Sequence, residues 1–286
     1  MPTLPTWPAF RCRWLSLLVV TVAAKAQDVP SWLPLRECSL ELAAHWEPLT
    51  DTTYAFEKRA LVRDLAPAAA RASYAAEAFR PFLPPAEVTV GASWKVDAAA
   101  VLPFLRQLHA GATTVLHHDG GMGIGAHGAW ASLRVLDESG AELMLRAHAE
   151  FLIAGDGSTN QSSWFTPAQF RGRLWLDRRS GHVTAFELAV PRSRANVDIN
   201  LAEPDGTSCD IGSVPRLQLV GGTFPEPAAS ALQISERAAE RILERRFYPF
   251  AELDWLDLPA ARAASLATGK PLHVVALFGS LPDESC

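Results

Sequence analysis

The chain has 286 residues, of which 49% are hydrophobic and 20% are charged, and its formal net charge is −5. This hydrophobic fraction is typical of a globular protein with a sizeable core, in one large domain or two smaller ones. The negative net charge argues against a nucleic-acid partner, because proteins that bind nucleic acid usually present a basic face.

The first 26 residues have the pattern of a secretory signal peptide. Arg11 and Arg13 precede an apolar stretch from Trp14 to Ala24, and Ala24-Lys25-Ala26 fits the rule of small residues at a cleavage site. We expect cleavage before Gln27 and an exported chain, periplasmic or extracellular; abundant Ala, Pro and Arg indicate a bacterial source. The apolar stretch is short for a bilayer span, so we expect no stable membrane insertion of the mature chain. The alternative is an uncleaved anchor.

Residues 27–85 are rich in alanine and predict a helical N-terminal region. Pro67 suits the first turn of a helix, and apolar residues follow it at helical spacing from Ala68 to Phe79. Pro84-Pro85 ends the region, because proline cannot continue a helix.

Residues 86–222 predict an α+β domain with an antiparallel sheet of roughly six strands, about the usual size. Asp97 can cap a helix that runs from Ala98 to Leu108 and stops at Gly111. From Thr113 onward the pattern changes to period two. It predicts a hairpin across the turn 137–140, a second hairpin of 170–176 with 182–190, and further strands at 196–201 and 214–220.

A linker from Gly221 to Pro227 leads into the last region, residues 223–286, which continues as two helices and an apolar strand. Ser235 can cap the first helix, which ends before Pro249, and the second helix, 259–268, stops at Gly269. The apolar run 272–278 and Cys286 follow. This order is how a thioredoxin-like domain opens, with the redox thiol at the start of a helix whose dipole favours the thiolate.

The fold class is therefore predicted as α+β: a helical N-terminal part, a central antiparallel β domain and the truncated start of a thioredoxin-like domain. Four cysteines are present, and Cys12 leaves with the signal peptide. The remaining three are an odd number for an oxidising compartment. Either Cys38 and Cys209 form a bridge and Cys286 is a free reactive thiol, or Cys38 and Cys209 are isolated, buried thiols.

Two loops resemble ligand-binding motifs but lack parts that the chemistry needs. Gly123 to Gly128 matches the dinucleotide-binding glycine pattern, but a strand follows it where the pyrophosphate needs a helix N-terminus. Asp156 to Asn160 opens like a calcium loop, but Gln161 and Pro167 replace the required glycine and glutamate. No Gly-x-Ser-x-Gly motif supports a serine hydrolase. We predict no cofactor.

Four histidines and Glu150 lie within residues 117–150. They are potential zinc ligands, because imidazole and carboxylate groups bind zinc well. The residues are His117, His118, His127, His148 and Glu150. Their spacing matches no known metal-binding pattern, so we predict no metal site.

Six segments, spread over about half of the chain, carry a resemblance: 146–151, 164–172, 190–198, 210–215, 248–250 and 279–286. Together and in this order they resemble the selenoprotein N family. In that family the last segment continues as Ser-Cys-selenocysteine-Gly, a redox pair resembling that of thioredoxin reductases.

The resemblance implies that the sequence ends just before the selenocysteine position, as it would where UGA is read as a stop codon. It implies a thiol–disulfide oxidoreductase with Cys286 as the catalytic residue present. A selenolate would attack a disulfide-containing protein or a peroxide, and Cys286 would resolve the intermediate. Vertebrate members lie in the endoplasmic reticulum membrane and carry an EF-hand; without that motif here, calcium sensing is not carried over. The alternative function is a non-catalytic exported protein-binding module.

Overall fold

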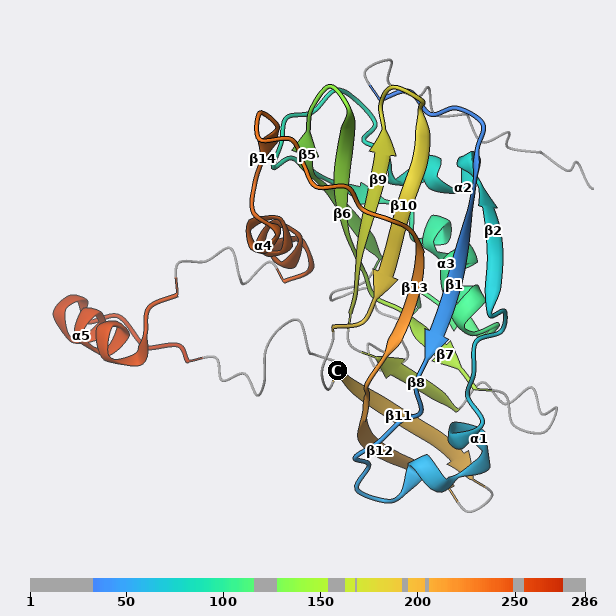
Figure 1. The fold of residues 1–286 in the computed structure, drawn as a ribbon. Helices are drawn as coiled ribbons and strands as arrows, with labels where there is room; N and C mark the ends of the chain where they lie inside the picture. Colours follow the sequence, from blue (N-terminus) through green and yellow to red (C-terminus); the bar gives the residue numbers. More distant parts are fainter. Residues whose placement is uncertain are drawn as a thin grey trace, which may run out of the picture.

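Two antiparallel β-sheets organise the computed structural model, which describes residues 33–115, 128–153, 163–167, 169–191, 195–203, 206–248 and 255–274 (Figure 1). The larger sheet follows the order β14-β5-β6-β9-β10-β13-β1-β2, and β3 also pairs with β5. Its strands are β1 (Ser39–Trp46), β2 (Arg71–Ala75), β3 (Ser93–Val96), β5 (Ala129–Leu136), β6 (Gly140–Ala147), β9 (Phe170–Asp177), β10 (His182–Ala189), β13 (Leu217–Gly222) and β14 (Leu232–Gln233).

The smaller sheet follows the order β12-β11-β8-β7-β4 and lies below the larger one in Figure 1. Aromatic side chains join the two sheets: Trp46 of β1 lies 5.4 Å from Phe165, and Phe165 stacks on Phe151 at 4.8 Å between ring centroids. The strands of the smaller sheet are β4 (Ala112–Thr113), β7 (Glu150–Leu152), β8 (Trp164–Pro167), β11 (Ala195–Glu203) and β12 (Gly206–Val214).

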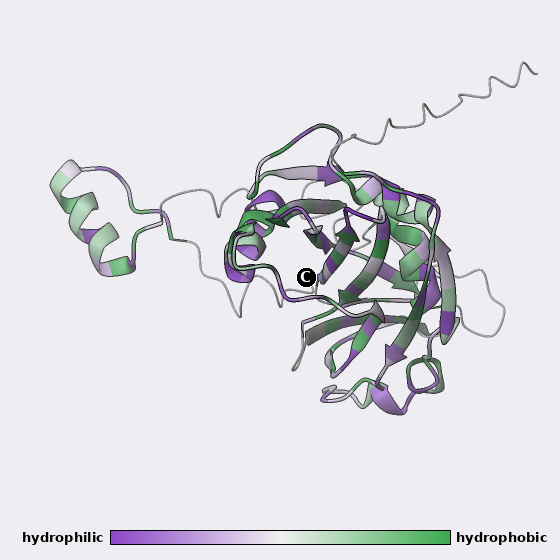
Figure 2. Ribbon diagram, turned by 45° about the horizontal axis from the view of Figure 1, so that its top comes forward, coloured by the Kyte–Doolittle hydropathy of each residue, from purple (hydrophilic) through white to green (hydrophobic). Residues whose placement is uncertain are grey.

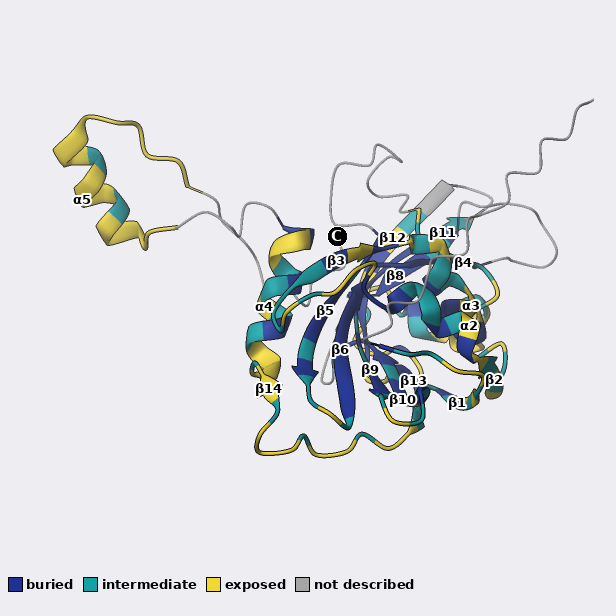
Figure 3. Ribbon diagram, turned by 90° about the horizontal axis from the view of Figure 1, so that it is seen from above, coloured by how far each residue is buried: buried dark blue, intermediate teal, exposed yellow. Residues whose placement is uncertain are grey.

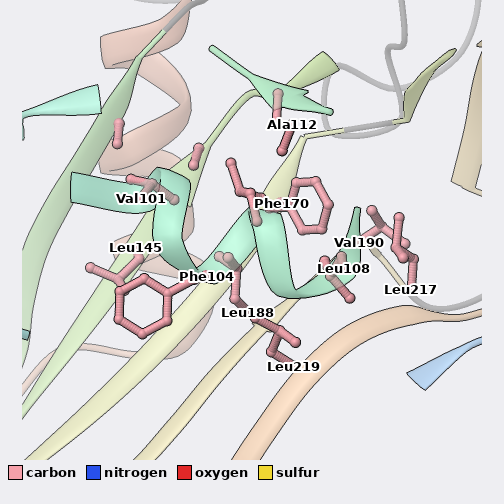
Figure 4. Close-up of a cluster of buried hydrophobic side chains, with 14 of the residues drawn as sticks. Val101, Phe104, Leu108, Ala112, Leu145, Phe170, Leu188, Val190, Leu217 and Leu219 are labelled. Carbon is pink, nitrogen blue, oxygen red and sulfur yellow. The ribbon is translucent and has the colours of Figure 1, made fainter. Parts of the chain in front are cut away.

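Helix α3 (Ala98–Leu108) covers one face of the larger sheet and forms the centre of the core. The carboxylate of Asp97 accepts a hydrogen bond from the amide of Ala99 at 2.9 Å, as the sequence predicts for the N-cap. Figure 4 shows Phe104 and Leu108 among side chains of the sheet such as Leu188. Each is 0–1% exposed, and burying such a side chain stabilises the fold by about 1.5–3 kcal/mol.

Helix α4 (Glu236–Phe247) packs on the opposite face of the larger sheet, over β5 and β6. Its buried residues Ala239 and Leu243 contact Met144 of β6. Because β6 has α3 on one face and α4 on the other, all eight of its residues are buried, as Figure 3 shows. The amide of Ala238 donates to the hydroxyl of Ser235 at 3.2 Å, which confirms the predicted cap.

The helical N-terminal region predicted for 27–85 is wrong, because β1 and β2 are strands of the larger sheet. The remaining helices there are short: η1 (Phe56–Lys58), α1 (Ala60–Arg63), α2 (Ala76–Phe79) and η2 (Arg80–Phe82). Within β2, exposed and half-buried residues alternate with period two, and Tyr74 lies opposite Leu40 of β1. Alanine-rich composition favours a helix only weakly, and strand pairing overrides that preference here.

Both predicted hairpins are confirmed as β5–β6 and β9–β10, whereas the chain after Asn196 differs from the prediction. β12 is an additional strand that the sequence did not predict. The strand predicted for 214–220 is observed as β13, which begins later, at Leu217. β1 pairs with β13 and β14 pairs with β5, so strands from all three predicted segments of the mature chain share one sheet.

Helix α5 (Leu258–Thr268) begins one residue before the predicted start and ends as predicted, with Gly269 in the left-handed conformation at φ 67°. It carries no buried residue and stands apart from the two sheets in Figure 2. Residues 272–274 of the predicted terminal strand form no strand, and 275–278 lie outside the described residues. A thioredoxin-like part is not confirmed. No helix in the described ranges is long and apolar enough to span a bilayer.

Candidate functional site

A buried arginine lies at the end of β6, close to the C-terminal end of α4. The side chain of Arg146 is 2% exposed, and its Nε donates to the side-chain oxygen of Gln169, which is 1% exposed. The guanidinium group also lies over the rings of Phe247 and Tyr248, 5.4 and 5.7 Å from their centroids. The guanidinium group of Arg146 therefore connects β6 to the C-terminal end of α4.

Gln169 completes this network, which we call the arginine clamp and define as Arg146, Gln169, Phe247 and Tyr248. The amide nitrogen of Gln169 donates to the hydroxyl of Tyr248 at 2.6 Å. Gln169 precedes β9, and β9 pairs with β6 so that Ala147 lies opposite Phe170. The register between these strands thus places the amide beside the guanidinium.

Burial lowers the pKa of Arg146, while Tyr248 and Glu244 of α4 raise it and Arg171 lowers it further. The buried Nη2 of Arg146 has no hydrogen-bond partner within the part of the chain that the structure describes. A buried charge is costly unless its hydrogen bonds are satisfied. The aromatic rings provide partial compensation, because a cation over an aromatic face is attracted by the ring quadrupole.

A cavity of about 330 Å³ lies beside the clamp, between α4 and strands β6, β9 and β10. Its walls include Met144, Arg171 and Arg173 from the sheet and Glu236 and Glu240 from the helix. Arg171 pairs with Glu240 at 2.7 Å across the cavity wall. The cavity walls therefore carry both charge signs.

A second ion-pair group fixes the sheet side of this cavity. Glu142 is 1% exposed and accepts from both Arg134 and Arg173, the latter at 2.6 Å. Arg173 also stacks over Phe224, 4.4 Å from the ring centroid. A carboxylate shared by two guanidinium groups holds both side chains in place on the sheet surface.

Polar side chains are also buried on the smaller sheet. Thr166 donates to the carboxylate of Glu150 at 3.2 Å, and both residues are 0% exposed. Asp198 of β11 lies opposite Thr166 in the strand register and is 8% exposed. Burial of a carboxylate beside a hydroxyl indicates a specific polar arrangement, because an unsatisfied buried carboxylate is costly.

The sequence prediction named none of the clamp residues as site residues. Arg146 and Glu142 are the two charged residues of the buried strand β6, and Gln169 stands directly before the apolar start of β9. A charged residue inside a buried strand is the signal that could have identified the clamp, since such residues are rarely buried without a partner.

The predicted catalytic residue, Cys286, lies outside the described residues. Cys38 and Cys209 are both free thiols, so the predicted alternative of a bridge between them is wrong for this structure. The expected burial of both thiols is wrong as well, because Cys38 is half-buried and Cys209 is exposed. Cys38 precedes β1 in the larger sheet, whereas Cys209 lies in β12 of the smaller sheet, and its Sγ contacts the Asn200 side-chain oxygen at 3.0 Å. The fold thus places these two cysteines in different sheets.

Three of the five potential zinc ligands, His117, His118 and His127, lie outside the described residues. Across the described ranges, no three His, Cys, Asp or Glu side chains form a group that could hold a metal ion. Most of the glycine loop 123–128 and the loop 156–161 also lie outside those ranges. β5 begins at Ala129, so a strand does follow the glycine pattern.

The fold and the clamp define a class: a mixed α/β protein built on two antiparallel sheets, with a buried arginine network between sheet and helix. Selenoprotein N of Homo sapiens is 28% identical over 346 aligned positions, covering 100% of this chain and 58% of the human protein. The Mus musculus protein is 28% identical over 75% of this chain and 47% of its own length. The Danio rerio protein is 27% identical over 56% of this chain and 34% of its own length.

No family model and no solved structure matches the chain. The three matches confirm the resemblance: the chain is similar to selenoprotein N, in the human case over 100% of its length. It spans about half the length of the human and mouse relatives that it matches. The clamp unites three of the six segments on which the resemblance rests, because Arg146, Gln169 and Tyr248 come from 146–151, 164–172 and 248–250.

Proposed function

We propose that this chain takes part in thiol–disulfide exchange of the selenoprotein N type, outside the cytoplasm, with Cys286 as a redox thiol. The observation that carries the proposal is the match to human selenoprotein N over the whole chain, which includes Cys286. The substrate would be a disulfide-containing protein or a peroxide.

The chemistry needs a thiolate at Cys286 and a second group that forms the bond to the substrate. In the order that the resemblance implies, a selenolate attacks one sulfur of the disulfide and releases the other as a thiolate. The Cys286 thiolate then attacks the mixed intermediate, releases the second substrate thiolate and closes a sulfur–selenium bond. An external dithiol must reduce that bond before the next cycle.

Thiol–disulfide exchange with oxidised glutathione tests whether Cys286 is the reactive thiol of the chain. Peptide mapping after brief incubation is expected to find glutathione mainly on Cys286, and Cys286→Ser should remove that modification. Cys38→Ser and Cys209→Ser are matched controls that should leave the reaction at Cys286 unchanged. Faster modification of Cys209, which is exposed, would contradict the proposal.

A chain extended by cysteine and glycine after Cys286 tests turnover, because it supplies the second thiol of the implied motif. We expect this chain to reduce a protein disulfide with a dithiol as electron donor, and to lose that activity on Cys286→Ser. Activity that survives Cys286→Ser would show that the resolving thiol is elsewhere.

The second candidate is a non-catalytic protein-binding module, and the cavity beside α4 favours it. Its walls carry arginines of β9 and glutamates of α4, so both charge signs line the cavity. Retention of partner binding by Cys286→Ser, together with no thiol reactivity of Cys286 in the unaltered chain, would support this function over the first.

A further inference from the structure

Three arginines form one row along the exposed side of α4. Arg237, Arg241 and Arg245 recur every four residues, and residues at this spacing are neighbours on a helix surface. All three are exposed, and Figure 3 shows the exposed side of α4 facing away from the sheet. We call these three residues the arginine row.

The acidic residues of the same helix form no ion pair with the arginine row: Glu240 and Glu244 interact with arginines of the sheet, and the exposed Glu236 lines the cavity. Glu240 lies three residues after Arg237 but pairs with Arg171 of β9 at 2.7 Å. Glu244 lies three residues after Arg241 but interacts electrostatically with the buried Arg146. Within the described part of the chain, the row takes part in no ion pair.

The row is unfavourable for the helix itself. Like charges four residues apart destabilise a helix, and Arg237 lies in the first turn, where the helix dipole disfavours a cation. Of the three arginines, the dipole favours only Arg245, in the last turn. It is also a local positive surface on a chain whose formal net charge is −5. Stability of α4 therefore does not explain the row, whereas attraction to an anionic partner does.

We propose that the arginine row binds an extended acidic segment of a partner polypeptide. Successive arginines are separated by about 6 Å along the helix axis, from a rise of about 1.5 Å per residue. In an extended chain, every second residue lies on the same side, about 6.7 Å apart. Acidic residues at alternate positions would therefore meet the arginines one by one. This proposal does not depend on Cys286 and goes beyond the exchange chemistry.

Fluorescence anisotropy of the full chain with a labelled peptide of alternating glutamate and threonine tests the proposal. Replacing the row by Arg237→Gln, Arg241→Gln and Arg245→Gln together should weaken binding at least about tenfold, since each exposed ion pair contributes modestly. A matched triple, Arg106→Gln, Arg216→Gln and Arg262→Gln, changes the net charge equally at other exposed positions. It should change the affinity less than about twofold, because distant exposed charges are screened.

Lysine at the three row positions should largely retain binding, because each contact needs only a positive charge. The glutamine triple should remain folded by circular dichroism, with a melting temperature no lower than that of the unaltered chain. Equal losses in the two glutamine triples, or no binding of the peptide to the unaltered chain, would overturn the proposal. Tighter binding of anionic lipid vesicles or single-stranded DNA than of the peptide would also overturn it.

Discussion

At the scale of single residues, the arginine clamp decides how the end of α4 is held against the sheet. Arg146 contacts β9 through Gln169 and contacts the helix end through Phe247 and Tyr248. Because Gln169 donates to Tyr248 from a buried position, loss of either partner leaves a polar group without a hydrogen bond.

Tyr248→Phe should lower the free energy of unfolding by about 1–2 kcal/mol, because the buried amide of Gln169 loses its acceptor. Urea denaturation measures the change. Tyr54→Phe is the matched control, since Tyr54 is 67% exposed and should tolerate the change. Equal stability of the two variants would show that the hydroxyl of Tyr248 does not stabilise the clamp.

His109 should make the stability of the chain depend on pH. Burial lowers its pKa, its Nδ1 accepts from the amide of Gly111 at 3.1 Å, and its ring packs on Trp46. A folded pKa below the unfolded value, about 6.5, gives stability that is present above that pH and is lost as the pH falls through the folded pKa. The stability falls because His109 takes up a proton more readily in the unfolded chain than in the folded one.

Urea denaturation at about pH 7 and about pH 5 measures this effect across the ordinary titration range of histidine. The unaltered chain should lose more stability over this interval than His109→Gln. His273→Gln, at an exposed position, should behave like the unaltered chain. An identical pH dependence in all three proteins would contradict the role of His109.

At the scale of elements, α3 and α5 begin with the same cap but differ in what they bury. The carboxylates of Asp97 and Asp257 accept hydrogen bonds at 2.9 and 2.8 Å from the amides of Ala99 and Ala260, respectively. α3 buries Phe104 and Leu108 in the core, whereas α5 buries no residue. Replacing the capping aspartate by alanine in each helix therefore tests global stability at α3 and local stability at α5.

Asp97→Ala should lower the global free energy of unfolding by about 1 kcal/mol, because a lost N-cap destabilises a helix that the core requires. Asp257→Ala should leave global stability unchanged and reduce only the helicity of α5. Urea denaturation and circular dichroism distinguish the two effects. A comparable global loss in Asp257→Ala would show that α5 packs on the rest of the chain.

At the scale of the whole molecule, the two sheets share one hydrophobic core while α5 takes no part in it. Trp46 of the larger sheet packs against Phe151 and Phe165 of the smaller one, and all three join the same cluster of apolar side chains. Exposed apolar residues, by contrast, gather near α5, with Leu258 and Leu266 60% and 78% exposed.

Hydrogen exchange should therefore show strong protection of β6, β9 and β10 and near-free exchange of α5, because few buried contacts oppose local opening of that helix. Both sheets should lose protection in one transition as urea is added. Phe151→Ala should lower protection in β9 as well as in β7, since its ring lies 6.1 Å from that of Phe170. Protection of α5 as strong as that of β6 would contradict this description.

The sequence by itself determined the elements whose signals are local. Asp97, Ser235 and Gly269 fixed helix ends through side-chain caps or a left-handed residue, and alternation with turn residues fixed the two hairpins. The resemblance to selenoprotein N also followed from sequence alone, because it rests on residue order. These features need no information about distant parts of the chain.

Only the tertiary structure decided that 71–75 is an edge strand, that α4 covers β6, and that Arg146, Gln169 and Tyr248 meet. Each depends on contacts between segments far apart in the sequence: Tyr248 lies 79 residues from Gln169. Alanine-rich composition could not reveal the pairing of β2 with β1, because burial and strand partners outweigh intrinsic preference. The clamp and the cavity exist because sheet register and helix packing bring these side chains together.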